Sequence, residues 1–191
     1  MLKLSLSIII GLFLSLQTFA GTRDDVTMAD SITVGGKTLL LNGMTTRTAS
    51  NFGITVKVYV GGLYLEAKES SGPKIVSSDT MKRVVMHYVF FRAPGKKIKK
   101  GWKDAFRKYC GDKAACKAEK ANLKIFNKQV KTMTKNDKMI LDFYKDKIDV
   151  TIEKKKKKTT VTIPSRKFAD IILKAFVMAK SKSFRGPLGI D

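Results

Sequence analysis

A single arginine precedes a long apolar segment that carries two tyrosines. Arg47 lies in the Gly- and Thr-rich stretch GMTTRTAS, and Tyr59 and Tyr64 lie in the run VKVYVGGLYLE that follows. A guanidinium is a permanent cation with a planar set of donors, which suits a carboxylate or an enolate oxygen. Tyrosine combines a bulky apolar ring with a polar hydroxyl. These residues predict one wall of an apolar cavity with a polar anchor at its end, and they place Arg47 in a turn before the strand.

A structural role for Arg47 stays open, because a loop arginine is more commonly exposed or ion-paired. The expected turn and the apolar strand beyond it favour a ligand-binding role, since binding pockets are apolar with few convergent polar groups. Gly61 and Gly62 fit this interpretation. Glycines weaken a strand interior unless they serve a bulge or the close approach of backbone or a ligand.

Other catalytic chemistry has little support in the sequence. His87 is the single histidine and lies in an apolar strand pattern. It has no Ser or Cys partner at a recognisable spacing, so we expect a structural histidine and no nucleophilic catalysis. There is no Gly-rich phosphate loop, paired-carboxylate motif or metal-ligand cluster in the sequence. We therefore expect neither a metal nor a cofactor.

The two cysteines, Cys110 and Cys116, are six residues apart. In an oxidising compartment such a pair is more commonly a disulfide than a metal site. A continuous helix would separate the two Cα atoms by about 9 Å in rise, beyond the roughly 7 Å that a disulfide spans. A bridge therefore requires a break in the helix, and Gly111-Asp112 supplies one.

Residues 1–20 have the layout of a secretory signal peptide. Lys3 gives a basic start, an apolar run extends from Leu4 to Leu16, and Thr-Phe-Ala closes the segment. An uncleaved anchor is the alternative, but the run is short for a spanning helix of about 20 residues. We expect cleavage near Ala20, a periplasmic or secreted protein, and a single domain over residues 21–191.

The chain is strongly basic, with 38 Lys plus Arg against 16 Asp plus Glu and a net charge of +22. In the cytosol this charge would suggest nucleic acid, but an exported protein meets little of it. An anionic ligand, an anionic membrane surface and a solvated basic face remain. The lysines are spread over every expected element, which favours the solvated face. The oligomeric state is not indicated.

The hydrophobic pattern predicts an α+β domain, an antiparallel sheet with helices packed on it. Residues 82–91 are apolar on both faces, which predicts a central strand covered on both sides. Residues 21–30 are expected to form a polar leader, and 67–81 a connection with one helical turn near residues 75–76. Strands are expected at residues 32–34, 37–41, 56–66, 82–91, 139–144, 148–152 and 159–163, and helices at 98–109, 113–130 and 168–179.

Several of these segments are similar to one known family. The pattern N-G-x-x-x-R followed by VYVGGLYLE resembles the bacterial secreted branch of the chalcone isomerase-like family, and so do IVSSDTMKRVVMHYVFFR, the Trp102 helix and IPSRKFADIILKAF. The resemblance covers nearly all of the chain after the first twenty residues. It implies the open-faced sandwich of that family, with Arg47 pointing into the ligand cleft.

The resemblance also argues against isomerase activity. Tyr59 stands where the isomerases have a threonine that polarises the substrate ketone, and its ring takes volume that a flavonoid would need. Ile98 lies nearest their helix-start tyrosine, and their asparagine has no match in GWKDAFRKYC. Non-enzymatic plant members of the family bind fatty acids.

The sequence thus predicts a non-catalytic protein that binds a small amphipathic or anionic ligand such as a fatty acid. Arg47 would hold the carboxylate with Tyr59 and Tyr64 near the polar end, while Tyr88 and Trp102 would lie near the tail. Two alternatives stay open. One is an intramolecular lyase of the chalcone isomerase type, in which Arg47 stabilises an enolate. The other is an envelope protein whose basic surface docks onto anionic lipid or polysaccharide.

Overall fold

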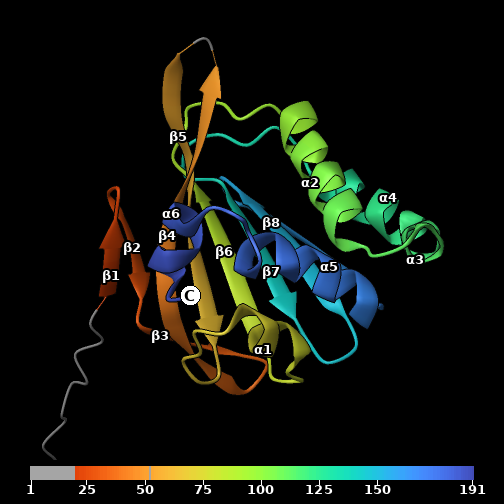
Figure 1. Ribbon diagram of the computed structural model, residues 1–191. Helices are drawn as coiled ribbons and strands as arrows, with labels where there is room; N and C mark the ends of the chain where they lie inside the picture. Colours follow the sequence, from red (N-terminus) through yellow and green to blue (C-terminus); the bar gives the residue numbers. More distant parts are fainter. Residues whose placement is uncertain (1–19, 52) are drawn as a thin grey trace, which may run out of the picture.

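The computed structural model describes residues 20–51 and 53–191, so most of the expected signal segment, residues 1–20, lies outside the described residues. A seven-stranded antiparallel sheet forms the centre of the molecule, and its strands follow chain order (Figure 1). They are β3 (Ser31–Val34), β4 (Lys37–Asn51), β5 (Ile54–Leu65), β6 (Lys82–Tyr88), β7 (Lys138–Phe143), β8 (Ile148–Lys154) and β9 (Lys157–Ile163). The sheet is curled, with helices packed on one face, which confirms the predicted α+β class.

The sheet has two ends with different connections. At the end where the β4–β5 hairpin projects, residues 89–137 join β6 to β7 and residues 155–156 join β8 to β9. We call this the hairpin end. At the other end, residues 66–81 join β5 to β6 and carry the short helix α1 (Gly72–Ser77), and residues 144–147 join β7 to β8. We call this the α1 end.

Helices cover one face of the sheet. Two of them supply most of the cover, α2 (Gly95–Tyr109) and α5 (Arg166–Val177), and both follow apolar stripes that the sequence predicted. Trp102 and Phe106 of α2 meet Phe168 and Phe176 of α5 and Phe126 in an aromatic core. The chain ends in α6 (Lys182–Arg185) and the 3-10 turn η1 (Gly186–Leu188).

The predicted helix over residues 113–130 forms two helices. These are α3 (Lys113–Ala118) and α4 (Lys120–Gln129), with Glu119 between them. The carboxylate of Glu119 accepts hydrogen bonds from Ser165, the residue before α5, and from Asn122. These contacts from a distant segment were not visible in the local pattern.

The disulfide between Cys110 and Cys116 is present, as predicted, with Cα atoms 5.2 Å apart. Helix α2 ends at Tyr109, Gly111 takes a φ of 89°, and the side chain of Asp112 caps α3. A left-handed conformation favours glycine. The break at Gly111-Asp112 is therefore what lets the two cysteines meet.

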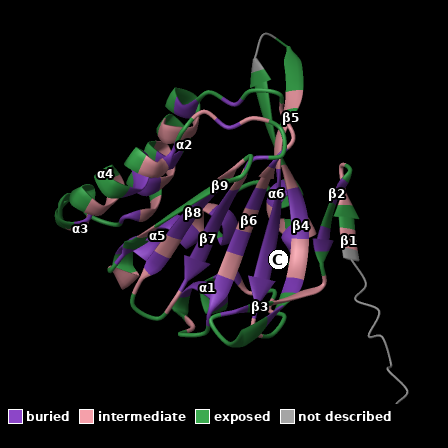
Figure 2. Ribbon diagram, turned by 180° about the vertical axis from the view of Figure 1, so that it is seen from behind, coloured by how far each residue is buried: buried purple, intermediate pink, exposed green. Residues whose placement is uncertain are grey.

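The other face of the sheet is covered only in part. Residues 21–30 form a hairpin of β1 (Ala20–Arg23) and β2 (Val26–Ala29) instead of the expected polar leader. Val26 and Met28 alternate with exposed residues and pack on β4 and β5, in a strand too short to give a clear pattern. Strand β6 is central, as predicted, but its face opposite the helices is half-exposed (Figure 2).

Candidate ligand cavity

A cavity of about 840 Å³ opens at the hairpin end, between the helix-covered face of the sheet and α2, α5 and α6. A volume of this size lies within the range of small-molecule sites, about 300–1,000 Å³. Its wall includes the strand residues Arg47, Val56, Val58, Tyr59, Met86 and Tyr88, the helix residues Lys97, Ile98, Gly101, Trp102, Ala105, Phe176 and Phe184, and Phe90 of the β6–α2 loop.

Three polar side chains form one row across the sheet at the cavity wall. Arg47 on β4 is the register partner of Tyr59 on β5, and Tyr59 is the register partner of Tyr88 on β6. Directly opposed residues of antiparallel strands share a face. The two tyrosine rings accordingly pack with centroids 5.6 Å apart. Strand register thus brings together three residues that the chain separates by up to forty-one positions.

The predicted turn around Arg47 is wrong, because Arg47 lies inside β4, which continues to Asn51. Its Thr-rich surroundings suit a strand, since β-branched residues favour extended backbone. The register shifts between Arg47 and Thr48, so a β-bulge lies beside the arginine. Such bulges bend a strand and redirect its side chains, and they occur next to functional sites.

Arg47 and Tyr88 both have donors that lack a protein acceptor. Arg47 makes no ion pair within residues 20–51 and 53–191. The hydroxyl of Tyr88 is buried and has no hydrogen-bond partner in the same part of the chain. Buried polar groups are normally paired. The buried hydroxyl of Tyr88 is therefore available to a ligand, and the donors of Arg47, an exposed residue of the cavity wall, are available to a ligand or to water.

Both phenols of the row stay protonated at neutral pH. Burial raises the pKa of Tyr59 to about 12, and the positive charge of Arg47 opposes this shift only in part. Burial also raises the pKa of Tyr88, with smaller contributions from Tyr59 and Asp137. A neutral phenol donates a hydrogen bond. The row thus presents donors, which suit an anionic or carbonyl oxygen.

The opposite part of the cavity is apolar. Trp102 packs against Phe126 and Phe176 with centroids 5.1 and 5.8 Å apart, and Phe184 adds a further ring near Phe176. The helix predicted over residues 98–109 supplies both core and cavity wall, and Trp102 lies at the predicted apolar part. The last wall component, Phe184, lies in a helix of four residues that gave no periodic signal.

The structure brings four of the five proposed binding residues to this cavity: Arg47, Tyr59, Tyr88 and Trp102. It places Tyr88 in the polar row rather than near the tail. Tyr64 lies on the other face of the sheet, where its hydroxyl donates to the carbonyl of Ala29 at 3.0 Å. An odd spacing of five residues from Tyr59 puts Tyr64 on the opposite face, because side chains alternate along a strand. Tyr64 thus stabilises the β1–β2 hairpin.

The two glycines before Tyr64 serve close packing on both faces. A Cβ on Gly62 would collide with the sulfur of Met28 in β2, and a Cβ on Gly61 would lie 3.4 Å from the ring of Tyr59. Neither residue lies at a bulge. The predicted close approach is therefore made by side chains of the protein.

Comparison with known proteins identifies the family. The profile of the chalcone isomerase-like family matches residues 20–183, so the chain belongs to this family. The crystal structure of an Arabidopsis thaliana fatty-acid binding protein is similar, with a TM-score of 0.67 and 14% identity over 90% of this chain and 96% of that chain. At this identity the likeness shows the fold alone. No curated protein sequence matches.

The described residues contain neither a metal-binding cluster nor a helix that could cross a membrane. The described part of the chain holds no group of three or more His, Cys, Asp or Glu side chains placed to bind a metal ion. Within residues 20–51 and 53–191, no helix combines the length and the apolar character that crossing a membrane requires.

Proposed function

We propose that this protein binds an amphiphile with an anionic head, of which a long-chain fatty acid is the simplest example. The observation that carries the proposal is the row of donors formed by Arg47, Tyr59 and Tyr88, in which the buried hydroxyl of Tyr88 is unpaired, at one side of a mainly apolar cavity. The carboxylate would accept from Arg47 and from the hydroxyls of Tyr59 and Tyr88. The chain would lie along Trp102 and the phenylalanines behind it.

Both parts of such a ligand, the anionic head and the hydrocarbon tail, would contribute to binding. A hydrogen bond to a charged group contributes about 1.5–3 kcal/mol, and it gains when it satisfies a donor that the protein leaves unpaired. Each buried methylene contributes about 0.8 kcal/mol. A carboxylate on a hydrocarbon chain uses both contributions, whereas a purely polar anion uses only the first.

The comparisons support the same ligand class. The Arabidopsis thaliana protein of the same fold is named as a fatty-acid binding protein. The row found here gives an independent reason to extend that chemistry to this chain, since it follows from the register of β4, β5 and β6.

We also infer that the protein acts outside the cytosol, as a member of a bacterial secreted branch of the family. The inference rests on the layout of residues 1–20 as a signal peptide. The bridge between Cys110 and Cys116 supports it, because disulfides persist in oxidising compartments. Thiol titration of the denatured protein from the native host should detect no free thiol. Two free thiols would remove this support.

The binding proposal is tested by replacing the anchor. Arg47→Ala should weaken the affinity for a fluorescent fatty acid by about tenfold or more, because it removes a charge-assisted hydrogen bond. Arg47→Lys should fall between, since lysine keeps the charge but not the planar geometry. Arg107→Ala, on the exposed side of α2, is the matched control and should leave the affinity unchanged. Unchanged affinity in Arg47→Ala would contradict the proposal.

A second variant tests the cavity without touching the anchor. A Cβ on Gly101 would meet no atom within 4 Å, and Gly101 lies on the cavity wall. Gly101→Phe should therefore fold, aided by the better helix propensity of phenylalanine, and should reduce fatty-acid binding by occupying the space. Full binding in this variant would place the ligand elsewhere.

One observation favours the alternative of a residual isomerase. The alternative requires a polar group besides Arg47 and Tyr59 at the cavity wall, and Tyr88, whose ring packs on that of Tyr59, supplies one on the next strand. A neutral phenol and a guanidinium could together stabilise an enolate. We expect no chalcone cyclisation above background, because the ring of Tyr59 occupies the wall where the substrate would lie. Saturable turnover that disappears in Arg47→Ala would establish the isomerase instead.

A further inference from the structure

The charges of the molecule are divided between the two ends of the sheet. At the hairpin end, residues 89–97, 130–138 and 154–158 contain eleven Lys and Arg and one acidic residue. At the α1 end, residues 66–81 and 142–149 contain six acidic and four basic residues. The even spread of lysines along the sequence therefore does not describe these two sets of segments, because six acidic residues offset the basic ones at the α1 end and one does so at the hairpin end.

The one acidic residue of the three hairpin-end segments does not offset their charge at the surface. Asp137 is 2% exposed and accepts hydrogen bonds from the backbone N–H and the hydroxyl of Thr134. Its carboxylate also lies 3.5 Å from the ammonium of Lys154. The exposed charged side chains of these three segments are consequently all cationic, and the neighbouring carboxylates of Glu153 and Asp24 are ion-paired with Lys158 and Lys57.

The two most exposed large apolar side chains of the described residues flank the cavity mouth at the same end. Phe91 is 73% exposed and Ile54 is 69% exposed, whereas Leu40, Ile125 and Met178 are each 38% exposed. Ile54 lines the cavity, and so does Phe90, whose ring packs on that of Phe91 at 4.5 Å. Figure 1 shows the β4–β5 hairpin and the β6–α2 loop side by side at this end.

We propose that the hairpin end docks onto an anionic phospholipid bilayer, with Phe91 and Ile54 entering the interface and the cavity mouth facing the lipid. Basic residues near an anionic leaflet each add to binding, and apolar side chains on protruding loops enter the boundary between headgroups and acyl chains. The apolar contacts lie on separate loop tips rather than on one continuous patch, which suits a deformable bilayer better than a protein partner. This proposal rests on the proposed function, since a bilayer is where a fatty acid would be collected or released.

The test uses the full mature chain and vesicles of phosphatidylcholine with and without phosphatidylglycerol. Wild type should co-sediment with the anionic vesicles and lose binding as salt is added. Phe91→Asp and the double variant Arg92→Glu/Lys96→Glu should each lower vesicle binding more than tenfold. Neither variant changes the cavity wall, so the affinity for a soluble fluorescent fatty acid should stay the same. Arg47→Ala gives the converse result if the two proposals are separate, with weaker fatty-acid binding and retained docking.

Two matched controls test whether vesicle binding is specific to the hairpin end. Lys68→Glu/Lys74→Glu makes the same change of charge at the α1 end, and Ile125→Asp removes an exposed apolar side chain on α4. Both should bind vesicles like wild type. Loss of vesicle binding in Lys68→Glu/Lys74→Glu, or retained vesicle binding in Phe91→Asp, would mean that the net charge alone attracts the protein to the vesicles. Either result would overturn docking through the hairpin end. A dimer that dissociates in Phe91→Asp would assign this surface to a second copy of the chain and would also overturn it.

Discussion

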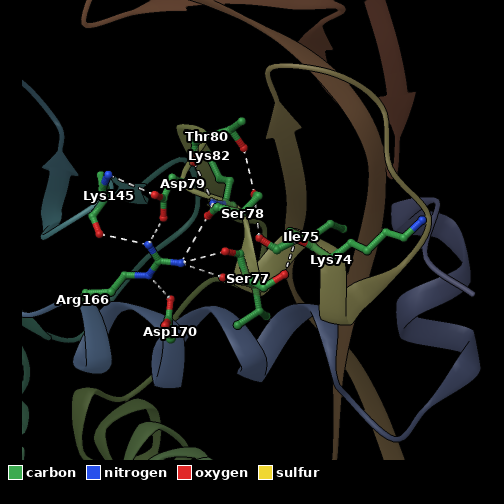
Figure 3. Close-up of polar contacts among 11 residues, drawn as sticks. Lys74, Ile75, Ser77, Ser78, Asp79, Thr80, Lys82, Lys145, Arg166 and Asp170 are labelled. Atoms are coloured by element: carbon green, nitrogen blue, oxygen red, sulfur yellow. Dashed lines mark hydrogen bonds and ion pairs between the residues drawn. The ribbon is translucent and has the colours of Figure 1, made fainter.

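Two arginines at opposite ends of the sheet use their donors in opposite ways. At the α1 end, Arg166 donates to the carboxylates of Asp170 and Asp79 at 2.8 and 2.6 Å (Figure 3). It also donates to the last carbonyls of α1, including those of Val76 and Ser77. At the hairpin end, Arg47 lies beside Tyr59 and makes no ion pair within residues 20–51 and 53–191.

The difference separates a structural arginine from a binding arginine of the same chain. The guanidinium of Arg166 compensates the C-terminal carbonyls of α1, which carry the negative end of the helix dipole. Acceptors within the protein pair its donors. The donors of Arg47 remain available at the wall of a cavity, so a ligand rather than the protein determines their partner.

The largest expected effect is on stability at the α1 end. Arg166→Ala should lower the free energy of unfolding by about 3 kcal/mol, because several helix-end carbonyls and the carboxylate of Asp170 lose their donor, whereas Asp79 keeps its ion pair with Lys145. Arg47→Ala should change it by less than about 0.5 kcal/mol. Urea denaturation of both variants measures the contrast. Equal losses would mean that Arg47 is structural too, and would remove the distinction between the two ends.

A second effect at the α1 end depends on pH. Lys82 is 4% exposed and donates to the carbonyls of Ser78 and Thr80 at 2.7 Å each. Burial, with a smaller contribution from the charge of Arg166, lowers the pKa of Lys82 to about 8. Between that pH and about 10.4 the unfolded lysine still holds its proton, so the unfolded state binds more protons and stability rises with pH.

The variant Lys82→Met isolates this contribution. The stability of wild type relative to Lys82→Met should rise between about pH 8 and 10.4, by a quantity on the order of 2 kcal/mol. The buried tyrosines titrate alike in both proteins and cancel in the difference. A flat difference across this range would show that Lys82 keeps an ordinary pKa.

The smallest effect on stability is expected in the polar row. Tyr88→Phe removes a buried hydroxyl that has no protein partner, so the free energy of unfolding should change by less than about 0.5 kcal/mol or rise. Fatty-acid affinity should fall several-fold. Tyr64→Phe is the matched control, because its hydroxyl bonds to the carbonyl of Ala29. That variant should lose about 1 kcal/mol of stability and keep its affinity. A reversed pattern would contradict the assignment of the row.

The sequence predicted those features that depend on neighbouring residues. The strands expected at residues 32–34 and 37–41 are joined by Gly35-Gly36, and both glycines take positive φ. The stripe with Trp102 predicted α2, and the break at Gly111-Asp112 predicted the geometry of the disulfide. In each case the deciding interaction lies within a few residues, so local periodicity and turn chemistry were sufficient.

The site was less predictable, because its parts meet through strand register. The Gly- and Thr-rich composition around Arg47 suggested a turn, whereas pairing with β5 makes it a strand. Tyr59 and Tyr64 were assigned to one site, although alternation along β5 sends them to opposite faces. Tyr88 was assigned to the tail, and its pairing with Tyr59 places it at the polar end.

The sequence by itself determined most of the central strands and helices, the bridge between Cys110 and Cys116, and the choice of Arg47 as the central candidate. These follow from periodicity, cysteine spacing and the chemistry of one side chain in an apolar context. The tertiary structure alone decided which donors stay unpaired and where the charges collect. Whether the donors of an arginine are paired depends on acceptors from distant segments of the chain. Arg166, for example, donates to the carbonyl of Val76. Lysines that are evenly spaced along the chain likewise form one basic end only after antiparallel pairing has brought their loops together.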